Sequence, residues 1–363
     1  MQTRRIMFAL AVVLTLAAPV KAKMMKPPAK QFYVQTNYDG FNFRAKRKDR
    51  FLINPWGMAF GPGTAIWIAD NNAGVSTLYN AKGKLLQPVV NIPPPMGSNA
   101  PSTPTGVLYN AHQNEFGGAL FIFCTEDGTI SSWNLSSGTG AQLMVDNSGK
   151  NSVYKALAMG TNASGDLIYV TDLHNNAIDV FDKGYNPVTV AGGFVDPAMP
   201  TNFSPFGIAN INGRLYVSYA MPDGAGVDEV NGAGNGYVDV FDTDGNLIKR
   251  LISQGALNSP WGMALAPSNF GPLSGDLLVG NFGDGHINAF NPTTGATINQ
   301  LLGSKGQPLV VDGLWALVFG NGSVGAANTL FFTAGPADQT EGVFGAFNLK
   351  TVKMGMGGGM GGY

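Results

Sequence analysis

Acidic and amide side chains recur in the sequence directly after short apolar segments, at the points where those segments end. In four similar segments these residues are Asp70 with Asn71, Glu126, Asp172, and Asn281 with Asp284. Hard cations such as calcium take about six to eight oxygen ligands, which carboxylates and amides supply. Carboxylates that converge also need a retained proton or a cation to offset their repulsion. Asp70, Glu126, Asp172 and Asn281 are therefore a candidate calcium site, provided that the fold brings the four segment ends together.

A local interpretation of the same residues stays open. Asp and Asn side chains after a strand often cap a tight turn by accepting hydrogen bonds from nearby backbone groups. His174 and His286 follow the same segments, but the sequence contains no His-Glu-x-x-His spacing and no nucleophile-elbow, phosphate-loop or dinucleotide motif. The residues thus indicate a ligand or cation site, and they give no ground for assuming catalysis.

Two further features could contribute to that site. Trp56, Trp261 and Trp315 each begin an apolar segment and would place large aromatic side chains beside the polar residues. Residues 221–235 form a glycine-rich stretch between two apolar segments, and they carry Asp228 and Glu229. Because long loops on a rigid scaffold often carry function, residues 221–235 are the candidate gate of the site.

Repetition of one unit predicts how these residues are positioned. A short apolar phrase begins at residues 56, 105, 155, 206, 261 and 315, so that the period is 49–55 residues. Each phrase is followed by a second apolar strand and by a third strand that ends in an aromatic residue and Asn or Asp. Four short strands at this period are typical of a propeller blade. The sequence therefore predicts an all-β fold, a six-bladed β-propeller of four-stranded blades, with the candidate residues at its channel mouth.

The ends of the repeat region predict how the ring closes. The sixth unit ends near Asn348 without a fourth strand, whereas residues 32–36 precede the first unit and have the length and composition of a strand. Pairing of this N-terminal strand with blade six would leave no free sheet edge. We therefore assign residues 32–349 to the propeller.

Composition agrees with this architecture. The chain has 50 Gly, 22 Pro, 44% hydrophobic residues and only 12% charged residues, which favours short strands and tight turns over disorder or long exposed helices. Residues 51–363 hold 21 acidic and 11 basic residues, so nucleic acid is excluded as an expected partner. Cys124, the one cysteine, lies in an apolar segment and is predicted to be buried and unreactive.

The N-terminus has the pattern of an export signal. Residues 1–22 contain Arg4 and Arg5, an apolar core and a small-residue cleavage site near Ala22. The core is short for a bilayer span, so no transmembrane span is expected in the mature chain. Residues 23–31 form a basic segment and residues 350–363 a Gly/Met-rich tail, both expected to be flexible. The expected protein is a monomer that is secreted or periplasmic.

Several phrases carry a resemblance to a known family. They are Asn54-Pro-Trp-Gly-Met-Ala, Thr171-Asp-Leu-His-Asn-Asn, the segment from Asn258 to Pro272, the segment from Gly275 to Gly285, and Asp312-Gly-Leu-Trp-Ala-Leu. From about Tyr33 to Asn348 the chain resembles an uncharacterised family of exported bacterial proteins with NHL-like or YVTN-like propellers. The resemblance implies a secreted six-bladed propeller and no particular reaction.

The function expected from these features is binding at the channel mouth, of a small molecule, a glycan, a cation or a protein. An alternative is a metal-dependent hydrolase or lyase resembling gluconolactonase or strictosidine-synthase-type propellers, in which a central divalent ion polarises a carbonyl or activates water. Those enzymes surround the ion with a Glu, two Asn and an Asp, which Glu126, Asp172, Asn281 and Asp70 could imitate. The order and loop contexts of these residues do not match those families, so binding is the preferred expectation.

Overall fold

The computed structural model describes residues 29–353 of the chain. Residues 31–351 form one compact unit. A second unit comprises residues 1–30 and 352–363, of which only 29–30 and 352–353 are described. The predicted signal peptide (1–22), most of the basic segment (23–31) and most of the Gly/Met-rich tail (350–363) lie outside the described residues.

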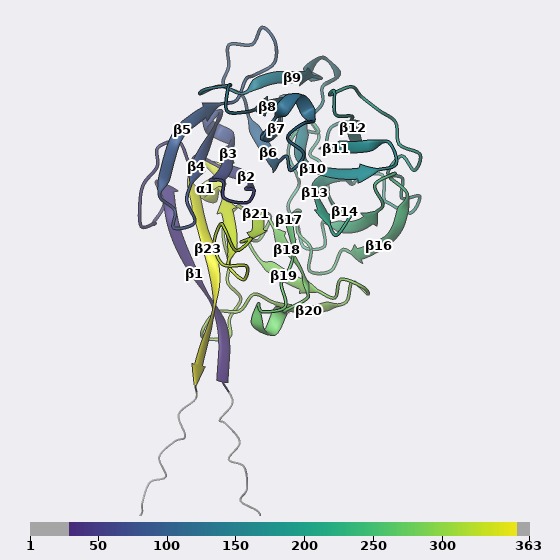
Figure 1. The fold of residues 1–363 in the computed structure, drawn as a ribbon. Coiled ribbons are helices and arrows are strands. Elements are labelled where there is room, and N and C mark those ends of the chain that lie inside the picture. The colour runs from purple at the N-terminus through teal and green to yellow at the C-terminus, as the bar shows by residue number, and fades with distance from the viewer. Residues whose placement is uncertain (1–28, 354–363) are drawn as a thin grey trace, which may run out of the picture. The chain divides into compact units, whose positions relative to one another are not determined.

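Residues 31–351 fold into six antiparallel sheets, which surround a central channel as the blades of a propeller (Figure 1). Blade one comprises β2 (Pro55–Ala59), β3 (Ile66–Asp70), β4 (Val75–Tyr79) and β5 (Leu85–Asn91), and blade two comprises β6 (Pro104–Tyr109), β7 (Phe121–Thr125), β8 (Thr129–Trp133) and β9 (Gln142–Asp146). Blade three comprises β10 (Tyr154–Asn162), β11 (Gly165–Asp172) and β12 (Ala177–Phe181), and blade four comprises β13 (Ser204–Ile211), β14 (Arg214–Ala220), β15 (Tyr237–Phe241) and β16 (Leu247–Ser253). Blade five comprises β17 (Pro260–Leu265), β18 (Leu277–Asn281), β19 (Ile287–Phe290) and β20 (Thr297–Gln300), and blade six comprises β21 (Leu314–Phe319), β22 (Leu330–Ala334), β23 (Gly342–Lys353) and β1 (Ala29–Phe41). The predicted fold class, an all-β six-bladed propeller, is confirmed.

Helical structure in the described residues is confined to short pieces of loop. Three-residue 3-10 turns lie at Asn71–Ala73, Phe116–Gly118, Ser148–Lys150 and Gly271–Leu273. The segment α1 (Pro336–Gln339) follows β22, and its residues Ala337 and Asp338 have left-handed backbone angles, with φ of 54° and 50°. Left-handed backbone in residues other than glycine costs free energy. The α1 segment is thus a tight, strained turn between β22 and β23. Within residues 29–353 no helix has the length and apolarity to cross a membrane.

The N-terminal strand closes the ring. In blade six the strand order is β1-β23-β22-β21, so that β1 is the outer strand and pairs with β23 (Figure 1). The predicted closure by residues 32–36 is therefore confirmed, although β1 extends beyond that stretch in both directions. Tyr33 anchors β1: its side chain is buried, its hydroxyl donates to the Phe270 carbonyl at 2.6 Å, and its backbone N–H donates to the Leu302 carbonyl at 3.0 Å.

Blade three departs from the others in its outer strand. A bridge between Phe181 and Pro187 and a backbone hydrogen bond from Val188 to Val180 occupy the fourth position in place of a longer strand. Proline has no N–H to donate to a sheet ladder, so Pro187 limits the pairing to this short stretch. The inner three strands still supply the channel wall and the mouth loops of this blade.

Glycine at the second position of the repeated phrase lets the inner strands approach one another. A Cβ added to Gly57 would lie 2.6 Å from the Thr105 carbonyl oxygen of the next blade, and one added to Gly207 or Gly262 would lie 2.3 Å from the carbonyl oxygen of Trp261 or Trp315. Real Cβ atoms do not approach backbone so closely, since packed interiors lack room for added volume. At these three positions glycine is therefore required by the close approach of the neighbouring inner strand, whereas blades three and six have Ala156 and Ala316 there.

Hydroxyl groups of the second strands join neighbouring blades. The Thr171 hydroxyl of β11 donates to the Phe206 carbonyl of blade four at 2.8 Å, and the Ser218 hydroxyl of β14 donates to the Pro260 carbonyl of blade five at 2.6 Å. Both bonds are buried, where a satisfied polar pair specifies one arrangement of the blades. Apolar clusters between blades add to this, as where Trp67 stacks on Phe121 at 4.3 Å between ring centroids.

Cys124 behaves as its sequence context predicts. The thiol lies in the apolar cluster between blades two and three and is buried. Burial raises its pKa to about 12, and a thiol that stays protonated is a poor nucleophile and metal ligand. The predicted buried, unreactive cysteine is confirmed.

We predict that Gly207→Ala lowers the free energy of unfolding by about 1–3 kcal/mol, because the added methyl overpacks the inner ring. A matched control is Gly140→Ala, since a Cβ at Gly140 meets no atom within 4 Å and its backbone is not left-handed. Chemical denaturation of both variants measures the difference. Equal stability of the two variants would show that the inner strands can accommodate the added methyl group without strain.

Candidate functional site at the channel mouth

The first residue of the repeated phrase lies at an irregularity in the inner strand of every blade. The inner strands β2, β6, β10, β13, β17 and β21 each shift register against the second strand of the blade at this point. Such bulges re-aim a side chain and are common next to functional sites. The residues at this position are Trp56, Thr105, Lys155, Phe206, Trp261 and Trp315.

Three of these residues form an aromatic cluster on the channel axis. The rings of Trp56 and Trp315 stack at 3.5 Å, and Trp261 packs edge-on against both at 6.1 and 5.8 Å. Phe282 stacks on the outer side of Trp315 at 4.1 Å. The three tryptophans were predicted near the rim, and the structure brings them together. They are buried, however, so they close the channel and support the polar residues beside them rather than exposing aromatic surface.

Lys155 is the one charged residue among the six. Its side chain is 0% exposed, its Nζ contacts a Glu126 carboxylate oxygen, and it lies 3.8 Å from Asp228 Oδ1 and 5.0 Å from the Trp56 ring centroid. Burial by itself would lower the pKa of Lys155, but the neighbouring carboxylates of Glu126, Glu229 and Asp228 outweigh burial and raise the pKa. The lysine is therefore a permanent positive charge at the centre of the mouth.

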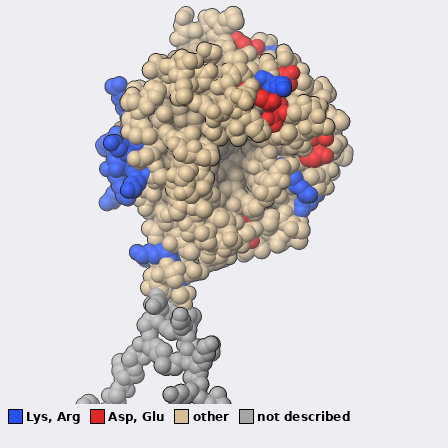
Figure 2. All heavy atoms as spheres, in the orientation of Figure 1, with Lys and Arg blue, Asp and Glu red and all other residues tan. Residues whose placement is uncertain are grey.

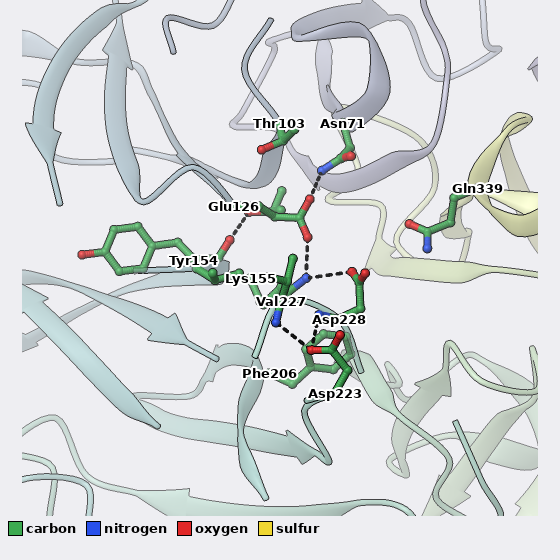
Figure 3. A network of polar contacts seen from close by, with 12 residues as sticks. Asn71, Thr103, Glu126, Tyr154, Lys155, Phe206, Asp223, Val227, Asp228 and Gln339 are labelled. Atoms are coloured by element: carbon green, nitrogen blue, oxygen red, sulfur yellow. Dashed lines mark hydrogen bonds and ion pairs between the residues drawn. The ribbon is translucent and has the colours of Figure 1, made fainter. Parts of the chain in front are cut away.

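A polar network runs from Lys155 across the mouth to blade six, and Figure 3 shows its part around Lys155, Glu126, Asn71 and Asp228. Asn71 donates its side-chain N–H to Glu126 Oε2 at 2.9 Å, and Asn54 donates to Gln339 Oε1 at 2.8 Å and lies 3.4 Å from Asn71 Oδ1. Asn54 Oδ1 in turn accepts the indole N–H of Trp315 at 3.0 Å. The strained turn α1 is what brings Gln339 to the network. Donors and acceptors thus alternate around the mouth, in contact with the aromatic cluster below.

The predicted gate, residues 221–235, is an ordered loop that reaches this network. Its stem is a β-bridge between Pro222 and Glu229, and the Asp223 N–H donates to the Asp228 carbonyl at 2.7 Å. The Asp223 carboxylate accepts the Val227 N–H at 2.9 Å, and this and neighbouring backbone hydrogen bonds lower its pKa. A carboxylate that caps a loop in this way holds it in one shape. We name residues 221–235 the lid, because this loop brings Asp228 and Glu229 close to Lys155.

The lid also contacts blade three. The Ala225 carbonyl lies 3.2 Å from Nδ1 of His174. His174, predicted to lie at the mouth, is therefore a partner of the lid rather than of the central lysine. The lid thus reaches from blade four to the neighbouring blade three and leaves Asp228 accessible, with 64% of its side chain exposed.

The four residues of the candidate calcium site do not converge, which corrects the geometric expectation. Asp70 is buried and accepts hydrogen bonds from Thr77 N and Oγ1 at 3.0 and 2.7 Å. Asp172 accepts the backbone N–H groups of Val153 and Asn175, both at 3.1 Å. In the part of the chain that the structure describes, one set of three His, Cys, Asp or Glu ligand atoms lies within 4.8 Å of one another, and it includes neither residue and not Glu126.

The physical reason is the position of the second strands. They lie outside the inner strands, so the short side chains at their ends meet their own turns and not the channel axis. Asn281 follows this pattern, since its side chain donates to the Ala256 carbonyl at 2.8 Å and to Asp284 at 3.1 Å. Asp284 also lies 3.2 Å from His286 Nδ1, so these two predicted site residues form a local pair in blade five. Glu126 alone reaches the centre, where Lys155 occupies the place expected for a cation.

Sequence reasoning missed Lys155, Asn54 and Gln339. A signal for Lys155 was available, because it begins the repeated phrase at a position where three blades have Trp and one has Phe. A charged residue at a position that is otherwise mostly aromatic breaks the local rule, and such breaks occur at functional sites. Asn54 lies two residues before the first phrase, but nothing in the sequence indicates that Gln339 would lie beside it.

The channel behind the aromatic cluster is narrow, and the side chains that line it are apolar. A cavity of ≈ 140 Å³ is lined by inner-strand residues of all six blades, among them Met58, Val107, Leu157, Met263 and Leu317. Figure 2 shows that the face in view is hollowed near the centre of the ring. A cavity of this size has room for several water molecules.

The pH dependence of stability should report on Glu229. Burial raises the pKa of this carboxyl to about 7, with Lys155 opposing the shift. Since the folded-state pKa lies above the unfolded value of about 4.3, the contribution of Glu229 to stability is present below pH 4 and is lost as pH rises through 7. We predict that Glu229→Gln gains stability relative to the wild type between pH 5 and pH 8. A constant difference in melting temperature over this range would contradict the prediction.

Fold and site together define a six-bladed β-propeller whose channel mouth holds a buried lysine–carboxylate network under a lid. No known protein-family profile matches the chain. Uncharacterized protein R648 of Acanthamoeba polyphaga mimivirus is 34% identical over 318 residues, which cover 84% of this chain and 76% of that protein. Uncharacterized protein L690 of the same virus is 33% identical over 320 residues, 84% of this chain and 82% of that protein. The chain belongs to the same family as these two proteins. Membership among exported bacterial proteins stays a prediction.

Solved structures with the same fold include enzymes. Gluconolactonase from Xanthomonas campestris superposes with a TM-score of 0.53 at 14% identity, covering 93% of this chain and 99% of that chain. Aldose sugar dehydrogenase from Streptomyces coelicolor gives a TM-score of 0.53 at 12% identity, covering 89% and 100%. At these identities the similarity shows the six-bladed fold alone.

Proposed function

We propose that the protein binds a small, hydroxyl-rich molecule, such as a carbohydrate or polyol, at the channel mouth between the Lys155 network and the lid. The observation that carries the proposal is the placement of Lys155. Burying a lysine among carboxylates costs desolvation, and a well-packed apolar residue would be at least as stable there. The other blades place Trp, Phe or Thr at this position, so the fold does not require the charge. A function does.

The chemistry of the mouth favours hydroxyl groups over anions. Lys155 and the amides of Asn54 and Asn71 supply donors, and Glu126 and Asp228 supply acceptors within the same network. Hydroxyl groups both donate and accept, so they can insert into such a network without leaving buried groups unpaired. The three carboxylates of the mouth outnumber its one lysine, which disfavours phosphates and other anions.

The test is a binding measurement with defined probes. Calorimetric titration with glucose, N-acetylglucosamine and myo-inositol should detect binding of at least one, and glucose 6-phosphate should bind more weakly than glucose. Removing a charged hydrogen-bonding partner typically costs about 1.5–3 kcal/mol, so Glu126→Gln and Asp228→Asn should each weaken binding about tenfold to a hundredfold. Asp146→Asn, outside the mouth, is the control. Absence of binding to all neutral probes at millimolar concentration would reject the proposal.

A second candidate is catalysis at the same mouth, favoured by the pKa of Glu229. A carboxyl whose pKa lies about 7 is suited to accept and return a proton at neutral pH. The alternative drawn from the sequence, a metal-dependent hydrolase or lyase, falls in this class. Hydrolysis of gluconolactone by the wild type and by Glu229→Gln, each with calcium and with EDTA, tests it. Turnover that depends on Glu229 would replace simple binding as the function.

We also propose that calcium binds at the mouth, but through other ligands than the four residues predicted from the sequence. Lys155 already neutralises Glu126, so a calcium ion would have to recruit the accessible carboxylate of Asp228 together with Glu229 and ligand or water oxygens. A ligand that binds only the folded state raises its stability. Melting with calcium and with EDTA, together with elemental analysis, therefore decides whether the ion is bound.

We also propose that the protein is exported and is cleaved near Ala22. This rests on the residues of the N-terminus, which lie outside the described part of the chain. Cell fractionation followed by N-terminal sequencing tests the proposal, and a protein that retains residues 1–22 in the cytoplasm would reject it.

A further inference from the structure

We propose that His112, Glu115 and Asp166 form a second site, which binds one divalent transition-metal ion such as zinc. His112 and Glu115 lie in the loop between β6 and β7 of blade two, and Asp166 lies near the start of β11 in blade three. Loops between first and second strands lie at the end of the blades opposite the mouth. The site is thus separate from the Lys155 network, and neither proposal depends on the other.

The three side chains form the one group in residues 29–353 whose ligand atoms, drawn from His, Cys, Asp and Glu, all lie within 4.8 Å of one another. Zinc binds histidine nitrogen and carboxylate oxygen at about 2.0–2.2 Å, so two ligands of one ion can lie up to about 4.4 Å apart. His112 Nδ1 and Asp166 Oδ2 are in direct contact, so an ion would replace the interaction between them and separate these two atoms, while the Glu115 carboxylate lies within reach of both. The side chain of His112 is 53% exposed, which leaves a path for the ion and a position for water.

Neighbouring groups orient the ligands. The Thr161 hydroxyl donates to Asp166 Oδ1, which leaves Oδ2 directed at His112 Nδ1. The backbone N–H of His112 donates to the buried Asn110 side chain at 2.8 Å, which fixes the start of the loop. Outer hydrogen bonds of this kind set the orientation of metal ligands.

An unpaired oxygen points to a missing cation. Lys183 lies 3.3 Å from Glu115 Oε1, whereas Glu115 Oε2 is buried and has no hydrogen-bond partner in the described residues. A buried carboxylate oxygen without a partner is costly. Asp166 brings a second carboxylate, with 8% of its side chain exposed, to the same place. A divalent cation would satisfy Glu115 Oε2 and offset the repulsion between the two carboxylates.

The ligand set indicates which ion. Two carboxylates balance the charge of a divalent cation, and an imidazole nitrogen favours zinc and similar transition metals over calcium. Calcium takes about six to eight oxygens, more than Glu115 and Asp166 can supply. Because the ligands come from two blades, a bound ion would also link blade two to blade three.

The experiment uses the full chain without a histidine tag, stripped with EDTA and then dialysed. Titration with zinc, followed by calorimetry, should show one ion per chain, and cobalt should give a visible absorption band. The variant Glu115→Gln/Asp166→Asn should weaken zinc binding at least tenfold, and His112→Ala should abolish the cobalt band. The matched controls are His174→Ala and His286→Ala, which remove the other two histidines of the chain.

Zinc should raise the melting temperature of the wild type and of both controls, and calcium should not reproduce the effect. If His112→Ala fails to fold, the Glu115→Gln/Asp166→Asn variant decides the question. The proposal is overturned if the stripped wild type binds no zinc at stoichiometric concentration. It is equally overturned if zinc binding survives in the His112→Ala and the Glu115→Gln/Asp166→Asn variants.

Discussion

Replacing Lys155 with methionine is expected to lower the free energy of unfolding by about 3–5 kcal/mol at pH 8, the range found when one partner of a buried ion pair is removed. The methionine side chain has the length to fill the space beside Trp56, so little packing is lost. In the variant, the charge of Glu126 faces Asp228 and Glu229 without a positive charge nearby. In the wild type, Lys155 lies among these three carboxylates. Chemical denaturation at fixed pH measures the loss.

A second substitution separates charge from packing. The double variant Lys155→Met/Glu126→Gln removes both members of the pair and should recover most of the lost stability, because an apolar replacement of a whole buried pair is often neutral. The control is Lys183→Met, which removes an exposed lysine that lies 3.3 Å from Glu115 and should cost less than 1 kcal/mol, as exposed pairs do. If Lys155→Met is as stable as the wild type, the Lys155 side chain is either uncharged or able to reach solvent.

The same substitutions bear on function. If the mouth binds a hydroxyl-rich ligand, the stable double variant should lose that binding although its fold is intact. Stability and binding then separate, because the lysine–carboxylate pair contributes little net stability but supplies the donors and acceptors. A double variant that binds as the wild type does would place the ligand elsewhere on the lid.

The fold could be predicted because it repeats. Six copies of one phrase, each followed by apolar strands, leave few architectures other than a propeller. The closing strand could also be predicted, because the sixth unit lacks an outer strand and residues 32–36 have the length and composition of one. The incomplete outer strand of blade three was not predicted, because the effect of Pro187 depends on which side of the strand faces a partner.

The site was predictable only in part. Glu126, Asp228, Glu229 and the three tryptophans do meet at the mouth, since ring closure carries equivalent positions to one axis. Asp70 and Asp172 do not, because sequence shows that a carboxylate follows a strand but not whether it turns back to a backbone N–H. The group of His112, Glu115 and Asp166 was missed because Asp166 lies 54 residues from His112 and on a different blade. Only the packing of neighbouring blades brings it to the other two.

We expect deletion of residues 1–41, and with them β1, to abolish cooperative unfolding of the propeller. Without β1 the backbone of β23 loses its partner along blade six, and an unpaired sheet edge is exposed. Tyr33 is lost with it, together with its buried hydrogen bond to Phe270 and a ring contact at 4.6 Å. Deleting residues 1–28 is the control, because it leaves all of β1 in place, and it should not change the melting temperature.

Single substitutions of Tyr33 separate the two ways in which its side chain anchors β1, the packing of its ring and the hydrogen bond of its hydroxyl. Tyr33→Ala removes a buried aromatic side chain, which costs about 3–5 kcal/mol in a core, whereas Tyr33→Phe removes only the hydrogen bond, about 1 kcal/mol. If the two substitutions lower the free energy of unfolding equally, the packing of the Tyr33 ring contributes nothing measurable to stability.

Addition of the strand as a peptide gives the most direct test of closure. A synthetic peptide of residues 29–41 should bind the protein lacking residues 1–41 and restore a cooperative melting transition, because an extended peptide can complete an open sheet edge through backbone hydrogen bonds. A peptide with Tyr33→Ala should restore it less well, and a scrambled peptide not at all. The truncated protein would melt as the wild type does, with no need of the peptide, if blade six were stable with three strands. That result would mean that the N-terminal strand covers the ring without closing it.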